Sequence, residues 1–327
     1  MIVHDYSSIS KLFLVGDIHG EFSEFFNNIK SKMPKQLKEN KKDVHPLVLE
    51  EEKEDKPVMD GFDFRISRRL FDKNSKNGTD YSNSVIIVAG DCGIGFNKLQ
   101  YYIDTFKNVN KLLEINNSFL LFIRGNHDDP SYFTEDKFGF SNIKCLSDYS
   151  IVKTKEYTTL CVGGGISIDR IWRKTQESRI NRFSHNNKKS LYWENEQVIY
   201  DESLIDEIVS YGIVINSVIS HSCPSNMFPI DKHGGKSWFK LDKNLLKDIR
   251  EERENLLKIY NKLRSVNQKP IFWAYGHFHI NNQIRNEDDI MCFAMDDRKF
   301  LNDIESLSDR CRKFSEISGF DILMPPF

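Results

Sequence analysis

Short apolar runs recur along the chain, and each one stops abruptly in glycine, aspartate, asparagine or histidine. Five such runs cover residues 11–20, 84–93, 118–128, 215–224 and 270–279. A continuous apolar run that ends at turn residues is typical of a strand buried on both faces. We therefore predict five buried strands, each with a cluster of polar residues at its end.

Amphipathic helical patterns lie between these runs. Apolar residues share one helical face within 22–29 and again within 99–113. Residues 201–211 predict a shorter helix that stops at Gly212, and residues 241–266 predict a long charged helix. Strands that alternate with helices are the signature of an α/β fold, in which ligands gather at the carboxyl ends of the strands.

Three further stretches complete the predicted fold. Residues 143–167 and 282–300 read as short strands joined by turns, so we expect antiparallel strands to extend the sheets. Residues 34–81 carry the charged run 50–56 and few periodic apolar positions, which indicates a solvated insertion. The apolar residues of this insertion leave open an alternative, an element that covers a substrate or binds a partner.

Composition narrows the class of protein. The 327 residues carry 46 Lys and Arg against 48 Asp and Glu, a net charge of −2, which gives no support to a globally basic nucleic-acid-binding surface. The six cysteines stand singly, which argues against a disulfide framework or a Cys-rich zinc site. Residues 1–10 lack a signal-peptide pattern, and no apolar run approaches the roughly 18–20 residues of a membrane span. We predict a cytoplasmic protein without a membrane partner.

The polar clusters that follow the five runs contain residue types that bind metal ions. Mixed carboxylate, amide and imidazole donors suit Mn, Fe, Zn, Co or Ni, and we expect Mn. Seven donors exceed what one ion takes from a protein while keeping an open position. We therefore predict two divalent ions that share a bridging carboxylate. The seven candidate ligands are Asp17, His19, Asp91, Asn126, His221, His277 and His279.

Each of these elements alone has an ordinary structural explanation. A single His at a strand end is more often a hydrogen-bonded structural residue, and Asp after Gly is more often a turn residue or a helix cap. The metal-site prediction depends on the joint pattern, in which all five strand ends supply a ligand. Because ligands from Asp17 to His279 must meet at one centre, we expect a single domain over residues 1–327.

The motif series resembles the calcineurin-like metallophosphoesterase superfamily. The motifs are Gly-Asp-Ile-His-Gly at 16–20, Gly-Asp at 90–91, Gly-Asn-His-Asp at 125–128, His221, and Gly-His-Phe-His at 276–279. All five stand in the order of that superfamily. The resemblance implies a four-layer α/β/β/α sandwich of two mixed sheets flanked by helices, with a dinuclear metal centre at the mouth of the sheets.

The resemblance also implies a role for each residue. Asp91 would bridge the two ions, and His127 would be the catalytic acid beside the leaving group. A hydroxide shared by the ions would attack phosphorus in line. The remaining ligands divide into two sets, namely Asp17, His19 and His279 for the first ion and Asn126, His221 and His277 for the second.

The second motif departs from the pattern of Ser/Thr protein phosphatases and symmetrical dinucleotide hydrolases, which this chain resembles elsewhere. Those families continue the motif as Gly-Asp-x-x-Asp-Arg-Gly. Here Ile94 replaces the Asp that orients the catalytic His, and Gly95 replaces the Arg that clamps phosphate. Loss of a guanidinium fork removes a specific phosphate contact. The departure disfavours a phosphoprotein substrate and favours a small phosphodiester or a nucleotide-type substrate.

Two other arginines stand shortly after a run of three glycines. We expect Arg170 or Arg173 to bind the substrate phosphate in place of the missing clamp. The alternative is a tight turn in which Arg170 pairs with Asp169 or Glu194. Nearby aromatic residues offer a flat surface for a base or sugar, and they are Trp172, Tyr192 and Trp193.

These expectations combine into a dinuclear metal-dependent phosphoesterase that acts on a small phosphoester. Two alternatives remain open, a Ser/Thr-type phosphoprotein phosphatase and a non-catalytic scaffold on the same fold. A scaffold is expected to have lost the catalytic His or several ligands, whereas this chain keeps all of them.

Overall fold

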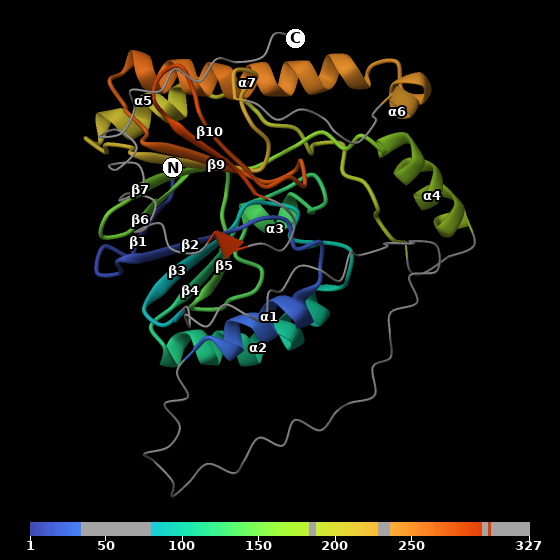
Figure 1. Cartoon of the computed structure of the whole chain (residues 1–327). Helices are drawn as coiled ribbons and strands as arrows, with labels where there is room; N and C mark the ends of the chain where they lie inside the picture. Colours follow the sequence, from blue (N-terminus) through green and yellow to red (C-terminus); the bar gives the residue numbers. More distant parts are fainter. Residues whose placement is uncertain (34–79, 183–187, 228–235, 296–299, 302–327) are drawn as a thin grey trace, which may run out of the picture.

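Two β-sheets lie face to face in the middle of the molecule, with helices on both outer sides (Figure 1). The computed structural model describes residues 1–33, 80–182, 188–227, 236–295 and 300–301. Apart from its last two positions, the predicted insertion at 34–81 lies outside the described residues.

Both sheets combine parallel and antiparallel strands. The seven-stranded sheet has the order β1 (Val3–Asp5), β6 (Ser150–Lys153), β7 (Thr158–Val162), β8 (Ser217–Ser220), β9 (Phe272–Tyr275), β11 (Met291–Ala294) and β10 (Asn282–Arg285). The five-stranded sheet has the order β12 (Phe300–Leu301), β2 (Lys11–Val15), β3 (Ser84–Val88), β4 (Phe119–Phe122) and β5 (Ile143–Cys145). Strands β2 to β5 are parallel to one another, as are β7, β8, β9 and β11. Antiparallel pairing joins β6 to β7, β10 to β11 and β12 to β2.

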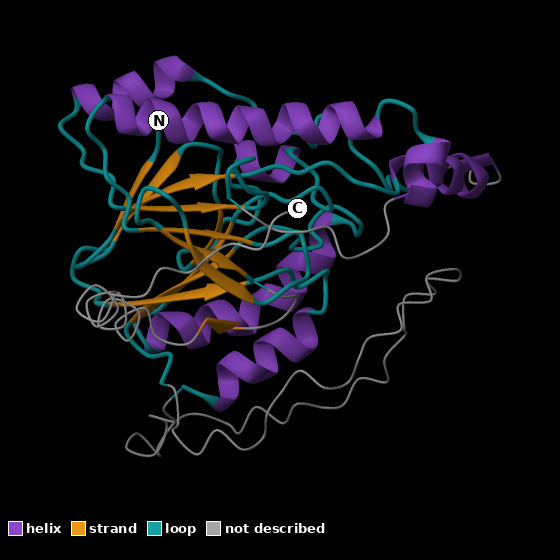
Figure 2. Cartoon of the chain, turned by 45° about the horizontal axis from the view of Figure 1, so that its top comes forward, coloured by secondary structure: helices purple, strands orange, loops and turns teal. Residues whose placement is uncertain are grey.

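Helices cover the outer face of each sheet. Helices α1 (Phe22–Ser31) and α2 (Leu99–Ile115) pack on the five-stranded sheet, and α5 (Glu202–Ser210) and α7 (Leu245–Ser265) pack on the seven-stranded sheet. Figure 2 shows the same succession of layers from a second direction. The remaining helices are α3 (Ser131–Thr134), α4 (Arg170–Arg182) and α6 (Lys236–Leu241). The predicted four-layer α/β/β/α sandwich is confirmed.

Successive residues of the buried strands enter different hydrophobic cores. In β2, Phe13 and Val15 join the core under α1 and α2, whereas Leu12 and Leu14 join the core between the two sheets. Side chains of a strand alternate between its faces, so a strand with apolar contacts on both sides needs apolar residues at every position. The four-layer arrangement therefore explains why the sequence shows continuous apolar runs.

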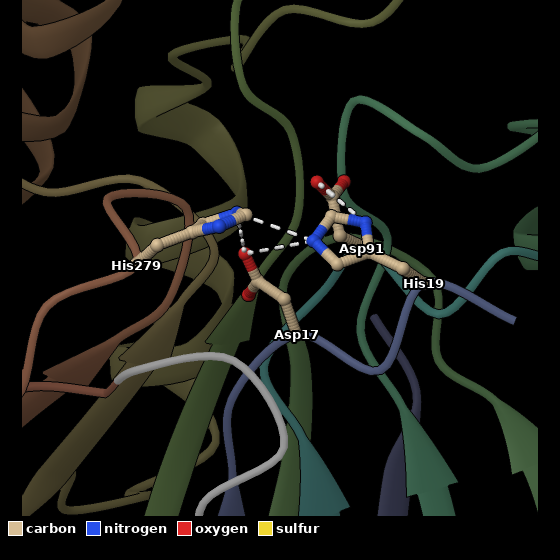
Figure 3. Close-up of side chains that lie close together, drawn as sticks. All are labelled: Asp17, His19, Asp91 and His279. Atoms are coloured by element: carbon tan, nitrogen blue, oxygen red, sulfur yellow. Dashed lines mark hydrogen bonds and ion pairs between the residues drawn. The ribbon is translucent and has the colours of Figure 1, made fainter. Parts of the chain in front are cut away.

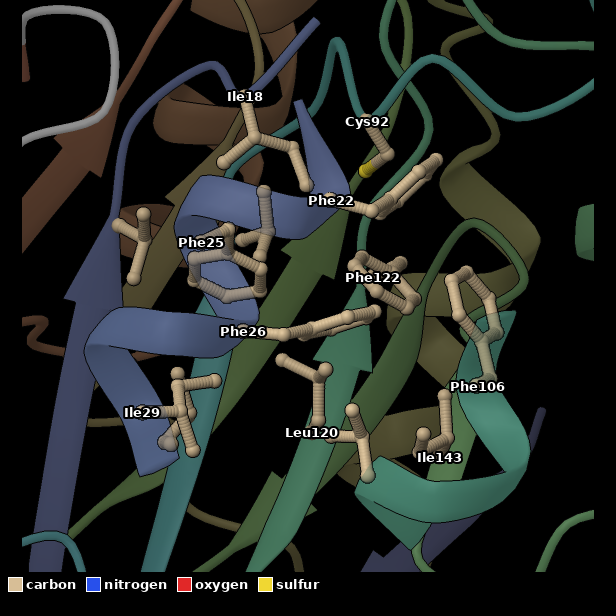
Figure 4. Packing of buried hydrophobic residues seen from close by; sticks show 14 of the residues in the cluster. Ile18, Phe22, Phe25, Phe26, Ile29, Cys92, Phe106, Leu120, Phe122 and Ile143 are labelled. Atoms are coloured by element: carbon tan, nitrogen blue, oxygen red, sulfur yellow. The ribbon is translucent and has the colours of Figure 1, made fainter. Parts of the chain in front are cut away.

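Aromatic side chains dominate the core beneath α1 and α2 (Figure 4). Phe22 and Phe26 of α1 lie with their ring centroids 5.0 and 5.5 Å from that of Phe106 in α2. All three are nearly inaccessible to solvent, and full burial of such a side chain stabilises a fold by about 1.5–3 kcal/mol. This core fixes α1, which follows the first polar cluster, against the strands that carry the next two.

The long charged helix begins later than predicted. Leu241 ends the short helix α6, and α7 starts at Leu245. Between them the carboxylate of Asp242 accepts a hydrogen bond from the backbone N–H of Asn244, at 3.1 Å. Hydrogen bonds of this kind to Asp side chains favour turns and helix starts. The contact of Asp242 therefore divides the predicted helix 241–266 after its first residue.

The five polar clusters lie at the carboxyl ends of β2, β3, β4, β8 and β9. Parallel neighbours within each sheet bring these ends to one edge, and the two sheets place their edges side by side. Among the helices that the structure describes, none combines the length and apolar character that crossing a membrane requires.

Candidate metal centre

Two groups of possible metal ligands share one carboxylate. The first contains Asp17, His19, Asp91 and His279, and the second contains Asp91 together with His221 and His277. Within each group the ligand atoms lie within 4.8 Å of one another. Asp91, which the sequence predicts to bridge two ions, is the member common to both groups.

The first group joins the end of β9 to the ends of β2 and β3 (Figure 3). Oδ2 of Asp17 lies 3.2 Å from Nε2 of His279, and that nitrogen lies 3.2 Å from Nε2 of His19. The other ring nitrogen of His19, Nδ1, is 3.9 Å from Oδ2 of Asp91. The nitrogen and oxygen donors thus face a common centre.

The second group is built around His221, which is fully buried. Its Nε2 lies 3.2 Å from Oδ1 of Asp91 and 2.9 Å from Oδ1 of Asn126. Its Nδ1 is 2.8 Å from the carbonyl oxygen of Ala89, which can only accept. The ring therefore donates from Nδ1 and presents Nε2 to the centre, as metal-binding histidines generally do. The ring of His277 stands edge-on to that of His221, with centroids 4.9 Å apart.

Backbone amides hold the two carboxylates in place. The N–H of His277 donates to both oxygens of Asp17, at 3.2 and 3.0 Å, and the N–H of His127 donates to Oδ1 of Asp91, at 2.8 Å. Asp17 and Asp91 are only 0% and 2% exposed. Each carboxylate therefore contacts a loop from another strand, which couples the positions of the ligands.

The loops that carry the ligands adopt an uncommon backbone conformation. Nine non-glycine residues of the described chain have a positive φ, and four of them are predicted ligands. These four are His19, Asp91, His277 and His279, with φ between 45° and 69°. Left-handed backbone is unfavourable for residues with a Cβ, and such residues concentrate at functional sites.

Two motif glycines allow ligands that follow different strands to approach one another. A Cβ on Gly125 would lie 2.2 Å from Oδ1 of Asp91, and a Cβ on Gly276 would lie 2.2 Å from Oδ1 of Asp17. Any other residue at either position would displace a carboxylate. The glycines beside Asn126 and His277 are therefore needed for the packing of the centre.

The protonation states of the imidazoles differ according to their neighbours. Burial disfavours a charge on His221, but the carboxylates of Asp91 and Asp17 outweigh it and raise the pKa of this imidazole to about 10. Burial, followed by the charge of His221, lowers the pKa of His277 to about 3. In the metal-free chain at neutral pH, the positively charged ring of His221 thus lies between the two carboxylates, where a cation is favoured.

The donors fit a pair of divalent ions. Nδ1 of His19 is buried and has no hydrogen-bond partner among the described residues, although a buried ring nitrogen normally has one. The donor set mixes imidazole nitrogens with carboxylate and amide oxygens, which suits borderline divalent metals.

Comparison with known families identifies the relationship. A family model described as "Calcineurin-like phosphoesterase" matches residues 10–281, which include both groups of ligands. The chain belongs to the calcineurin-like phosphoesterase family. None of the curated proteins matches the chain. Among the solved structures that match, a crystal structure aligns with the chain at 12% identity and a TM-score of 0.35, over 68% of this chain and 84% of that one.

In this calcineurin-like phosphoesterase, Arg173 lies beside the predicted catalytic acid. Its Nη2 is 2.6 Å from Nε2 of His127, and because a guanidinium can only donate, the imidazole accepts. Nε of Arg173 donates to Asp169 at 2.7 Å, and Nη1 donates to the carbonyl oxygen of Leu191 at 3.3 Å. Burial, followed by the charge of Arg173, places the pKa of His127 well below its ordinary value.

Arg170 has different partners. Its Nε and Nη2 donate to Asp242 and Asp248, at 2.5 and 2.6 Å. Residues 168–169 form the expected turn, and α4 begins directly after them at Arg170. The alternative pairing of Arg170 with Asp169 or Glu194 is therefore wrong, since Asp169 pairs with Arg173 and Glu194 with Lys174.

Gly95, which stands where related phosphatases carry the clamp arginine, has no room for a side chain. A Cβ there would lie 2.3 Å from Cβ of Asp129 and 3.0 Å from Cζ2 of Trp193. The ring of Trp193 in turn meets that of Phe96, with centroids 5.1 Å apart. Two aromatic side chains therefore cover the part of the second motif where the clamp is missing.

Asp128 of the third motif and Arg124, which directly precedes that motif, have roles that the sequence did not indicate. The fully buried carboxylate of Asp128 accepts hydrogen bonds from the N–H groups of Cys92, Ile94 and Gly125, at 2.8–3.0 Å. Burial raises the pKa of Asp128 to about 6. Arg124 donates to the backbone of residues 195–197. Both side chains hold loops together.

The raised pKa of His221 makes the stability of the metal-free protein depend on pH. Because the pKa is about 10 in the fold and near 6.5 in an unfolded chain, protonation stabilises the fold fully below pH 6.5 and this contribution is lost as the pH rises toward 10. From pH 7 to 9 we expect His221 to contribute a loss of up to about 1.4 kcal/mol per pH unit, in addition to the loss from the Glu196 carboxyl, whose pKa of about 8 lies in the same range. Urea unfolding of chelator-treated protein measures it. Mn²⁺-loaded protein is the control and should lose less, and equal slopes for the two forms would contradict the expectation.

Proposed function

We propose that this chain is a dinuclear metal-dependent phosphoesterase that hydrolyses a small phosphodiester or nucleotide-type substrate. The observation that carries the proposal is the position of Asp91, whose carboxylate belongs to both groups of ligands. A shared carboxylate is what two closely spaced ions require. Membership of the calcineurin-like phosphoesterase family supports the same reaction class.

Seven side chains would hold the ions, and we propose Mn²⁺ as the metal. Asp17, His19 and His279 would bind one ion, and Asn126, His221 and His277 would bind the other. Two such ions would supply Lewis-acid activation of the phosphoryl group and of a water nucleophile. The protein provides a buried and rigid frame for them, because backbone N–H groups orient both carboxylates.

Arg173 and His127 would act on the substrate itself. The buried guanidinium of Arg173 is positioned by Asp169 and by the carbonyl of Leu191, which leaves Nη2 beside the ring of His127. A phosphoester bound there would place negative charge next to the imidazole and favour its protonation. His127 would then donate that proton to the departing oxygen.

The proposed substrate class is supported by what replaces the clamp arginine. At Gly95 the backbone is covered by Asp129 and Trp193, which leaves no room for an arginine there. The guanidinium of Arg173, which comes from α4, would therefore bind the phosphate instead. The half-exposed rings of Phe96 and Trp193 offer apolar contact for a base or sugar on the leaving group. These features favour a small organic phosphodiester over a phosphoprotein.

Replacing the shared carboxylate tests the dinuclear centre. We expect Asp91→Asn to lose most of its turnover of bis-p-nitrophenyl phosphate and to bind Mn²⁺ at least about tenfold more weakly, because the amide carries no charge to share between two ions. Turnover assays and metal analysis of the purified protein measure both effects. Asp136→Asn, at an exposed ion pair with Lys144, is the matched control and should behave as wild type.

Three results would contradict this proposal. Full turnover by Asp91→Asn would remove the shared carboxylate from the reaction. Wild-type protein that binds no Mn²⁺ and hydrolyses neither bis-p-nitrophenyl phosphate nor p-nitrophenyl phosphate would favour the scaffold alternative. Clear preference for p-nitrophenyl phosphate or a phosphopeptide would reverse the proposed substrate class.

A pair of arginine variants tests the phosphate contact. Arg173→Ala should raise KM for bis-p-nitrophenyl phosphate about ten- to hundredfold, since a hydrogen bond to a charged group contributes about 1.5–3 kcal/mol. Arg170→Ala should leave KM unchanged, because both of its carboxylate partners lie on the α6–α7 side. Steady-state kinetics on the two Mn²⁺-loaded variants measure this, and an unchanged KM in Arg173→Ala would remove Arg173 from substrate binding.

A further inference from the structure

The amide of Asn126 binds a metal ion only through its oxygen. The two ends of an amide are nearly equal in size, so packing alone does not distinguish the productive orientation from the flipped one. Hydrogen bonds from neighbouring residues must therefore select it. Asn126 is 3% exposed, so these neighbours are protein groups.

We infer that Ser167 and Glu196 are positioning residues that fix the amide of Asn126 with its oxygen toward the second ion. Nδ2 of Asn126 donates to Oγ of Ser167 at 2.9 Å. That hydroxyl donates to Oε2 of Glu196 at 2.6 Å, and the backbone N–H of Ser167 donates to Oε1 at 3.0 Å. The inference rests on the proposed function, because it concerns the affinity of the same metal centre.

The direction of these hydrogen bonds selects the orientation. A serine hydroxyl has one proton and two lone pairs, and here the proton goes to the carboxylate of Glu196. Toward Asn126 the hydroxyl can then only accept, so it must face the NH₂ end of the amide. If the amide flipped, two oxygens would face each other in a site where Ser167 and Glu196 are each only 1% exposed.

Glu196 is held in place by two other strand ends. Nη1 of Arg124, which follows β4, donates to the carbonyl oxygen of Glu196 at 2.8 Å. The N–H of Gly165, which follows β7, donates to the same oxygen at 3.0 Å. The backbone of Glu196 is thus fixed relative to the loops that carry Asn126 and Ser167. Ser167 and Glu196, which lie outside the five motifs quoted above, would therefore determine the geometry of the second metal site.

Mn²⁺ binding to purified full-length protein tests the inference by calorimetry, without reference to turnover. Burial raises the pKa of Glu196 to about 8, although the two hydrogen bonds from Ser167 act to lower it. The titration is therefore run at pH 8.5 without oxygen, where the carboxyl is mostly ionised. We expect Ser167→Ala to weaken one of the two binding events about 10- to 100-fold and to leave the other unchanged. Glu196→Gln should weaken the same event by a smaller factor.

Combining variants separates positioning from general stability. If Ser167 acts through Asn126, Ser167→Ala should have no further effect on Mn²⁺ affinity in an Asn126→Ala background. The chain offers a matched control in Asn110, Ser141 and Glu114, which are linked by the same kinds of side-chain contact away from the centre. Ser141→Ala should leave both binding events as in wild type.

Each outcome bears on one idea alone. Unchanged affinities in Ser167→Ala, or equal weakening of both events together with a lower melting temperature of the metal-free protein, would overturn the positioning role and leave the proposed function intact. Wild-type protein that does not bind two ions would instead contradict the proposed function. Loss of the Ser167→Ala effect in the Asn126→Ala background would support the inference.

Discussion

Two carboxylates are buried away from water at one point of the molecule, and the rest of the structure depends on this constraint. Asp17 and Asp91 are almost fully buried and approach the same imidazoles. Burying charge is costly unless donors and opposite charge surround it. Backbone N–H groups of His277 and His127 supply the donors, and these come from other strands, so the two sheets must bring their edges together. The left-handed backbone at the ligands is one cost of that arrangement.

Most of the frame could be predicted from sequence because it depends on local patterns. A strand with a hydrophobic core on each side must be apolar throughout, so β2, β3 and β4 can be recognised in the sequence as apolar runs. If the ends of these strands meet at a metal centre, the residues after each run must include a metal ligand. The start of α4 could not be predicted in this way. Its 170–182 segment is strongly polar and shows a single buried residue, Arg173, so it has no apolar stripe to detect.

The interactions around the candidate ligands could not be predicted from the sequence for a different reason. Asp128, Arg124 and Glu196 act largely through backbone groups of residues distant in sequence, or through side chains such as Ser167 that have no distinctive spacing. Each looks locally like an ordinary turn or surface residue. Arg170 shows the same limit, because its two carboxylate partners lie more than 70 residues away and any of several acidic residues would have satisfied the sequence.

The crowding around Gly95 restricts how this enzyme can change its specificity. Elsewhere in the family an arginine at this position is part of the phosphate site, and one codon change would introduce it here. Such a side chain would meet Asp129 and Trp193 before it reached the centre. An arginine at position 95 would therefore require coordinated changes at Asp129 and Trp193 as well. During such an exchange Arg173 of α4 would still occupy its own place beside His127. Under the phosphate contact that we propose for Arg173, the two arrangements are therefore separated by an epistatic barrier.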